Sequence, residues 1–172
     1  IDLFCQNVIA KEKIDALINS AEIFKPVDMG STTLDDWNAH LQINLTTPFM
    51  LSQSLFTNFS GKVPGRIINI VDWRALKPGK DHFPYTISKA ALASMTKTMA
   101  VSMAPKILVN GIALGAILPP ENQEQDSEIL SKVPMQRWAD LNELKKLITY
   151  LLIDATYITG EIIHLDGGCH LL

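Results

Sequence analysis

The feature that most constrains the fold is an alternation of short, apolar runs with longer helical stretches. Residues 66–71 (RIINIV) and 107–113 (ILVNGIA) are brief and rich in β-branched side chains, which favours buried strands. Residues 13–19 and 161–165 predict two further short strands. Buried strands that alternate with helices are typical of a parallel sheet covered on both faces. The sequence therefore predicts one α/β domain over residues 1–172, built on a doubly wound parallel sheet.

Three helices are predicted between and after these strands. The first begins at Thr33, whose hydroxyl and following carboxylates suit a helix start, and runs to about residue 57. The second covers residues 83–103, which are rich in alanine, and ends before Pro105. The third covers residues 142–152, which are apolar at helical spacing. Residues 119–126 predict a polar, proline-led loop.

Composition excludes several classes of protein. A chain of 172 residues with 47% hydrophobic and 19% charged residues can bury a core, which argues against disorder. The formal net charge of -3 leaves no excess of positive charge with which to bind a nucleic acid. No apolar run approaches the roughly 20 residues that a membrane-spanning helix needs. Cys5 and Cys169 are too few and too far apart for a disulfide framework, which predicts a reducing, cytoplasmic setting.

The candidate chemistry lies at Tyr85 and Lys89. Residues at i and i+4 share one helix face, and an ammonium beside a phenol favours the phenolate, so Tyr85 is expected to exchange a proton near neutral pH. A tyrosine and a lysine at this spacing are also common as a surface pair. This pair, however, opens a helix directly after a predicted strand and its loop, where an open parallel sheet presents residues to a ligand.

Five segments in the same order resemble the short-chain dehydrogenase/reductase family. Residues 19–21 (NSA) resemble its NNAG element, and residues 43–45 (INL) resemble the helix that carries its active-site asparagine. Residues 85–89 (YTISK) match its YxxxK motif, residues 109–113 match the following strand, and residues 157–168 match its carboxyl end. The resemblance covers nearly the whole chain and implies a Rossmann-like fold with a nicotinamide cofactor.

The resemblance also implies roles for individual residues. Tyr85 would donate a proton, Lys89 would bond the nicotinamide ribose and lower the pKa of Tyr85, and Asn44 would support a proton-relay water near Lys89. Gly115 stands where the family has the glycine of a Pro-Gly pair, although Leu114 replaces the proline. The implied cofactor contacts are Asn19, Ser20, Ala21, Tyr85, Lys89, Gly115 and Ile117. The four histidines show no metal-ligand spacing, so no metal site is predicted.

One departure from the family concerns the cofactor loop. The TGxxxGxG element is absent, and Gly30 is the only glycine among residues 1–60. By the family pattern the chain starts near the helix before the fourth strand and forms the carboxyl-terminal two-thirds of such a protein. Residues 1–172 expressed alone are therefore expected to fold poorly and not to bind NADPH. NADP(H) is implied by the resemblance, and NAD(H) stays open.

A second departure is Asp72, thirteen positions before Tyr85, where most family members have a serine. A carboxyl group in a site of low dielectric can have a raised pKa and donate a proton. Asp72 after Val71 resembles the pteridine reductases of this family, which reduce pterin rings with hydride from NADPH. An ordinary turn or cap residue is the alternative. Trp73 and Arg74 would border a flat, polar heterocycle, and simple packing of Trp73 stays equally open.

The predicted function is reduction of pterins by an NADP(H)-dependent enzyme, with a small-molecule substrate. The alternatives are a carbonyl or 3-oxoacyl-thioester reductase of the same family and a non-catalytic binding member, against which the Tyr85 and Lys89 pair argues. Small and apolar residues occupy more than one face of the helix at 83–103. One face would cover the sheet and another would meet a second copy, so a homotetramer or homodimer is expected.

Overall fold

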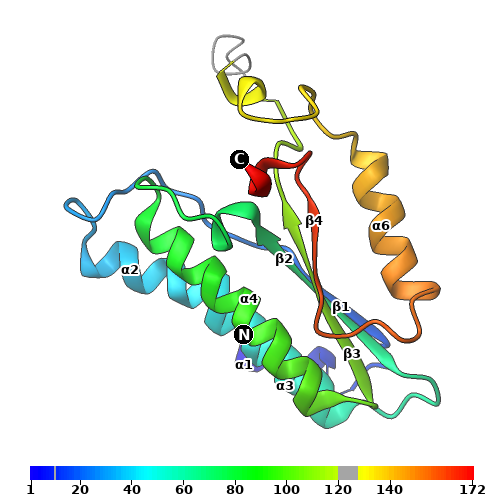
Figure 1. Cartoon of the computed structure of the whole chain (residues 1–172). Helices are drawn as coiled ribbons and strands as arrows, with labels where there is room; N and C mark the ends of the chain where they lie inside the picture. Colours follow the sequence, from blue (N-terminus) through cyan, green and yellow to red (C-terminus); the bar gives the residue numbers. More distant parts are fainter. Residues whose placement is uncertain (10, 120–127) are drawn as a thin grey trace.

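Four parallel strands form the centre of the computed structural model, which describes residues 1–9, 11–119 and 128–172 (Figure 1). The strands pair in the order β1-β2-β3-β4, and every pairing is parallel. This arrangement confirms the predicted α/β class and parallel sheet. The strands are β1 (Ala16–Asn19), β2 (Gly65–Asp72), β3 (Ile107–Leu114) and β4 (Ile162–Leu165).

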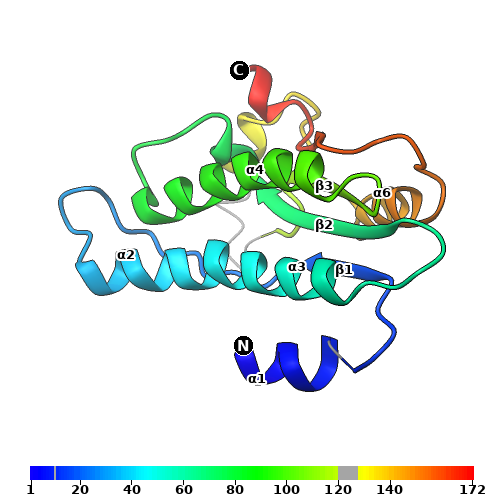
Figure 2. The ribbon, with the colours of Figure 1, turned by 90° about the horizontal axis from the view of Figure 1, so that it is seen from below.

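Helices cover both faces of the sheet. Figure 1 shows α3 and α4 on one face and α6 on the other. Figure 2 shows the amino-terminal turns beside α3, a packing that the sequence did not predict. No helix within the described ranges is long and apolar enough to cross a membrane. The helical elements are α1 (Asp2–Phe4), η1 (Cys5–Ile9), α2 (Leu34–Leu41), η2 (Gln42–Thr46), α3 (Thr47–Asn58), η3 (Trp73–Ala75), α4 (Phe83–Met103), α6 (Leu141–Ile153) and η4 (Cys169–Leu171).

The core is divided by the sheet because successive side chains of a strand point to opposite faces. Ile67 of β2 packs with the buried side chains of α3 and α4, while its neighbour Ile68 packs with Leu151 of α6. Seven of the eight residues of β3 are buried, which is the pattern of a strand covered on both faces. The continuous apolar runs of β2 and β3 therefore reflect the doubly wound fold.

The predicted helix from Thr33 to residue 57 is interrupted. Thr33 caps α2, and its hydroxyl accepts a hydrogen bond from Asp36 N at 3.1 Å. The helix then widens into the π turn η2 before it continues as α3. Pro48 explains this change. In a regular α-helix Pro48 could not donate a hydrogen bond to the carbonyl of Asn44, four residues earlier, and its ring would collide with that carbonyl. The predicted loop at 119–126 lies outside the described residues except for Pro119.

Candidate active site

Three strand ends and the first turn of α4 meet at one edge of the sheet. β1 ends at Asn19, β2 ends at Asp72, and β3 ends at Leu114, paired with Asp72. Because the strands are parallel, their carboxyl ends lie side by side, and open α/β sheets bind ligands at this edge. The fold thus brings the predicted site residues of separate segments to one place.

Tyr85, Asp72 and Lys89 form the centre of this edge. The Tyr85 hydroxyl donates to Asp72 Oδ2 at 3.2 Å, and Lys89 Nζ donates to the carbonyl of Ile70 at 2.8 Å. Tyr85 and Lys89 are both only 1% exposed. Their spacing on α4 places Lys89 Nζ 5.7 Å from the centroid of the Tyr85 ring. The structure therefore brings the predicted pair and Asp72 together.

Glu22 is a member of this cluster that the sequence did not predict. Its Oε2 lies 2.6 Å from Lys89 Nζ, and it accepts a hydrogen bond from the Tyr85 hydroxyl at 3.4 Å. Residues 19–21 resemble the family's NNAG element, and Glu22 stands at the position where that element ends in glycine. That exchange of a glycine for an acid is the signal that points to Glu22. Lys89 thus faces a carboxylate from the loop after β1.

The charges around Tyr85 reverse one expectation. Burial raises the pKa of Tyr85, and the nearby carboxylates of Asp72 and Glu22 raise this pKa further. The expected lowering of the Tyr85 pKa by Lys89 is therefore wrong in its net direction, because burial and the two carboxylates raise this pKa. That Tyr85 donates a proton stays a prediction.

Burial also raises the pKa of Asp72. Hydrogen bonds from Arg74 N, at 2.7 Å, and from the Tyr85 hydroxyl oppose this rise without cancelling it. The carboxyl of Asp72 also caps the short helix η3 through its bond to Arg74 N. The structure thus bears out the alternative of a cap residue. The other carboxyl oxygen faces Tyr85, and the chemical role of Asp72 stays a prediction.

Asn44 lies in the π turn η2, a type of irregularity that is frequent at functional sites. Its amide accepts a hydrogen bond from Ile23 N at 2.9 Å and donates to Ile23 O at 3.1 Å and to Ser88 Oγ at 3.0 Å. The side chain is 1% exposed, so these bonds satisfy an amide that would otherwise be costly to bury. Asn44 thereby fastens the loop after β1 to α4, and its support of a relay water stays a prediction.

Asn19 is tied into the interior. Its Nδ2 donates to Asn69 Oδ1 at 2.8 Å and to Ser52 Oγ at 3.3 Å, and Asn69 in turn donates to Thr96. The Oδ1 atom of Asn19 is buried and has no partner among the described residues. Asn19 therefore positions the end of β1.

The other predicted cofactor contacts lie along the same edge. Ser20 and Ala21 are exposed where the chain leaves β1. Gly115 allows a close approach, because a Cβ atom there would lie 2.5 Å from the Cα of Asp166. Ile117 is half-buried after the end of β3. Their contacts with a cofactor stay predictions.

An exposed aromatic ring borders the site. Phe24 is 49% exposed, and its ring meets that of Tyr85 edge to face, with centroids 4.6 Å apart. It also stacks on His82 at 4.0 Å. The guanidinium of Arg74 lies 5.7 Å from the centroid of Phe24 and 5.2 Å from that of Trp73. The structure thus places the Arg74 guanidinium close to both Trp73 and Phe24. Phe24 forms an aromatic platform that the sequence did not predict.

The matches to known proteins agree with this geometry. Residues 3–170 match the family model described as Enoyl-(Acyl carrier protein) reductase. The chain belongs to the short-chain dehydrogenase/reductase family. It is 35% identical over 165 residues to 3-oxoacyl-[acyl-carrier-protein] reductase FabG of Buchnera aphidicola, covering 92% of this chain and 67% of that protein.

Solved structures of short-chain dehydrogenases/reductases share the fold. FolM alternative dihydrofolate reductase 1 from Brucella canis, complexed with NADP, has a TM-score of 0.86 at 36% identity, over 92% of this chain and 64% of that one. A blue fluorescent protein from a metagenomic library, in complex with NADPH, has a TM-score of 0.88 at 27% identity, over 96% and 69% of the two chains. The predicted family is confirmed, and the chain spans about two thirds of the length of these relatives.

Proposed function

We propose that the chain carries the catalytic centre of an NADP(H)-dependent reductase that acts on pterins, with Tyr85 as the proton donor. One observation carries this proposal: the Asp72 carboxyl lies 3.2 Å from the Tyr85 hydroxyl, at the position of the serine usual in the family. The 36% identity to an alternative dihydrofolate reductase, complexed with NADP, supports the same substrate class and cofactor.

The residues present fit a nicotinamide cofactor, which when bound supplies the hydride. An ammonium has three N–H donors, and two donors of Lys89 are directed at Ile70 O and Glu22. The third is left for a ribose hydroxyl. Ser20 and Ala21 are exposed where the chain leaves β1 and would line the cofactor, with Asn19, Gly115 and Ile117 along the same edge. NAD(H) in place of NADP(H) is the alternative.

Tyr85 would complete the reduction by giving its hydroxyl proton to a ring nitrogen of the substrate. Lys89 would stabilise the phenolate that results, and the raised pKa of Asp72 makes its carboxyl a better source of a replacement proton than an ordinary aspartate. Glu22 opposes the phenolate by its negative charge. It therefore favours the protonated tyrosine that reduction requires over the phenolate that oxidation requires.

The rim of the site supports this substrate class. Phe24 offers a half-exposed aromatic ring beside Tyr85, and Arg74 offers N–H donors close to the same ring. Flat heterocycles stack on aromatic faces, and the guanidinium of arginine pairs with their polar edges. A pterin has both features, whereas a 3-oxoacyl chain has no flat ring to stack.

A second candidate function is reduction of a 3-oxoacyl thioester. The 35% identity to a 3-oxoacyl-[acyl-carrier-protein] reductase favours it. In that case Asp72 would only cap η3, and Tyr85 would protonate a developing alkoxide.

Because residues 1–172 alone are not expected to bind NADPH, the test uses the purified full-length protein that contains them. It follows the oxidation of NADPH with dihydrobiopterin, dihydrofolate and an acetoacetyl thioester in parallel. The proposal expects turnover of the two pterin substrates and little with the thioester. Turnover of the thioester alone would establish the second candidate instead. Tyr85→Phe should abolish either activity and serves as the control for a contaminating reductase.

A further inference from the structure

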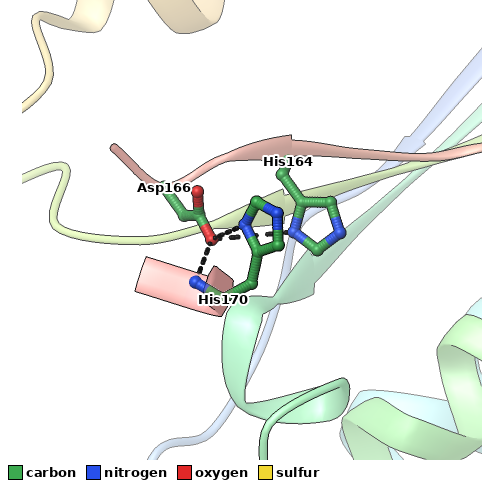
Figure 3. A group of neighbouring side chains, drawn as sticks. All are labelled: His164, Asp166 and His170. Carbon is green, nitrogen blue, oxygen red and sulfur yellow. Dashed lines mark hydrogen bonds and ion pairs between the residues drawn. The ribbon is translucent and has the colours of Figure 1, made fainter. Parts of the chain in front are cut away.

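The carboxyl end of the chain gathers three potential metal ligands. Figure 3 shows His164 of β4, Asp166 directly after it and His170 of η4, with both imidazole rings turned toward one carboxylate oxygen. One ligand atom from each residue lies within 4.8 Å of the other two. The prediction that the histidines are scattered is therefore wrong for this pair. Gly167 and Gly168, with φ of 61° and 91°, make the turn that brings His170 back beside His164.

The spacing of these atoms suits a small cation. His170 Nδ1 lies 2.7 Å and His164 Nδ1 lies 3.6 Å from Asp166 Oδ2. Ligand atoms around a tetrahedral zinc ion, with bonds of about 2.0–2.1 Å, lie roughly 3.3 Å apart. The two observed separations fall on either side of this value. The two imidazole rings are stacked, with centroids 3.8 Å apart, so at least one ring must turn out of the stack to direct both nitrogens at one ion.

One ligand atom lacks a partner. His164 Nδ1 is buried and makes no hydrogen bond with any described residue, because its 3.6 Å separation from Asp166 is too long for one. A buried, unsatisfied nitrogen costs free energy that a bound cation would recover. The imidazole of His164 is 27% exposed and that of His170 is 29% exposed, so an ion can enter and keep a water as a further ligand.

Backbone bonds hold the Asp166 carboxylate in place. Gly168 N donates to its Oδ1 at 2.9 Å, and His170 N donates to its Oδ2 at 3.0 Å. Hydrogen-bond partners of this kind commonly orient the ligands of a metal ion.

We propose that His164, Asp166 and His170 bind a divalent transition-metal ion, best matched by zinc. Two imidazoles and one carboxylate are a common donor set for zinc, whereas magnesium and calcium take oxygen ligands almost exclusively. The ion would fasten η4 to the end of β4. It would also hold Asp166 against Gly115, the close contact at the end of β3. This proposal does not depend on the substrate of the active site.

The first experiment measures zinc binding by the purified protein after chelator treatment and dialysis, using isothermal titration calorimetry. One zinc ion per chain is expected. Loading with cobalt should give the intense visible absorption of a tetrahedral complex. His164→Ala and His170→Ala should each weaken zinc binding by at least about 100-fold, because each removes a direct ligand. A folded parent protein that binds no zinc would overturn the proposal.

Two control variants keep the test specific. His82→Ala removes a histidine outside the cluster, and Cys169→Ser removes the adjacent thiol, whose sulfur lies 3.8 Å from Lys132 O. Both should bind zinc like the parent. Asp166→Asn retains an oxygen for the backbone bonds but loses the charge, so it should fold, as circular dichroism would report, and bind zinc weakly. Parent-like zinc binding by His170→Ala, or its loss in Cys169→Ser, would contradict the assigned ligands.

Discussion

The two sides of the candidate active site differ in burial and in how well the sequence predicts them. The α4 side consists of Tyr85 and Lys89, each 1% exposed. The β1 side is the loop that carries Glu22, whose side chain is 38% exposed, and Phe24, which is 49% exposed. Rigid elements hold reacting groups more accurately than loops do, while loops carry the variation that changes function. The comparison suggests that the α4 side performs the proton transfer and the β1 side adjusts its charge and its substrate.

The largest effect is expected on the α4 side. Tyr85→Phe should lower the rate of NADPH-dependent reduction by at least about 10⁴-fold, the upper end of what a positioned proton donor contributes. The phenyl ring keeps the packing of the buried tyrosine, so the thermal unfolding temperature should change little. Steady-state kinetics and a thermal melt check both points. A variant with parent-like turnover would remove Tyr85 from the mechanism.

The α4 side is also the part that the sequence predicts best. Tyr85 and Lys89 lie one helical turn apart, so local spacing alone places them on one face. Glu22 reaches Lys89 across 67 positions of the chain, as the residue numbers show, and only the parallel pairing of β1 with β2 brings them together. His164 and His170 meet through a glycine turn whose direction no ligand-spacing motif encodes. The sequence therefore did not predict the contacts that only the tertiary fold creates.

The same distinction holds for the fold. The runs that form β2 and β3 are buried on both faces, so their composition predicts them directly. The π turn at Gln42–Thr46 was missed although Pro48 signals it, because helical patterning around it is otherwise continuous. The packing of η1 against α3 was missed because it depends on a surface that only the folded α3 presents.

A second prediction concerns the negative charge that Glu22 contributes to the β1 side. Glu22→Gln removes a negative charge that raises the pKa values of Tyr85 and Asp72, so both pKa values should fall. Reduction requires protonated Tyr85, so the alkaline limb of the pH profile of kcat should move to lower pH. Asp35→Asn, at an exposed carboxylate of α2, is the matched control and should leave the profile unchanged. An unchanged profile in Glu22→Gln would mean that Glu22 does not influence the proton donor.

A third, smaller effect is expected at the aromatic platform. Phe24→Leu should raise KM for dihydrobiopterin by about 2- to 10-fold, since an aromatic pair contributes about 0.5–1.5 kcal/mol. Turnover at saturation should stay near that of the parent, because Phe24 donates no proton. Phe49→Leu, at a 43% exposed phenyl ring of α3, is the control. If Phe24→Leu left KM unchanged, the platform would not bind the substrate.

Substitutions on the outer face of α3 and α4 are expected to change turnover least, because this face belongs to neither side of the candidate site. Leu45, Phe49 and Met95 line an apolar depression there. We expect this face to meet a second copy in a homodimer or homotetramer. Light scattering at micromolar concentration should give a mass of at least two chains, and Phe49→Glu should lower it. A monomeric parent would contradict this assembly.

The central claim is that Asp72 and Tyr85 work together on a pterin. The most direct measurement is kcat of Asp72→Asn and Asp72→Ser with dihydrobiopterin and with an acetoacetyl thioester. Asn retains an oxygen for the cap bond to Arg74 N but cannot supply a proton, so turnover of the pterin should fall by roughly 10²–10⁴-fold. Asp72→Ser should not restore it. Parent-like pterin turnover by Asp72→Asn would contradict the account and leave Asp72 as the cap of η3.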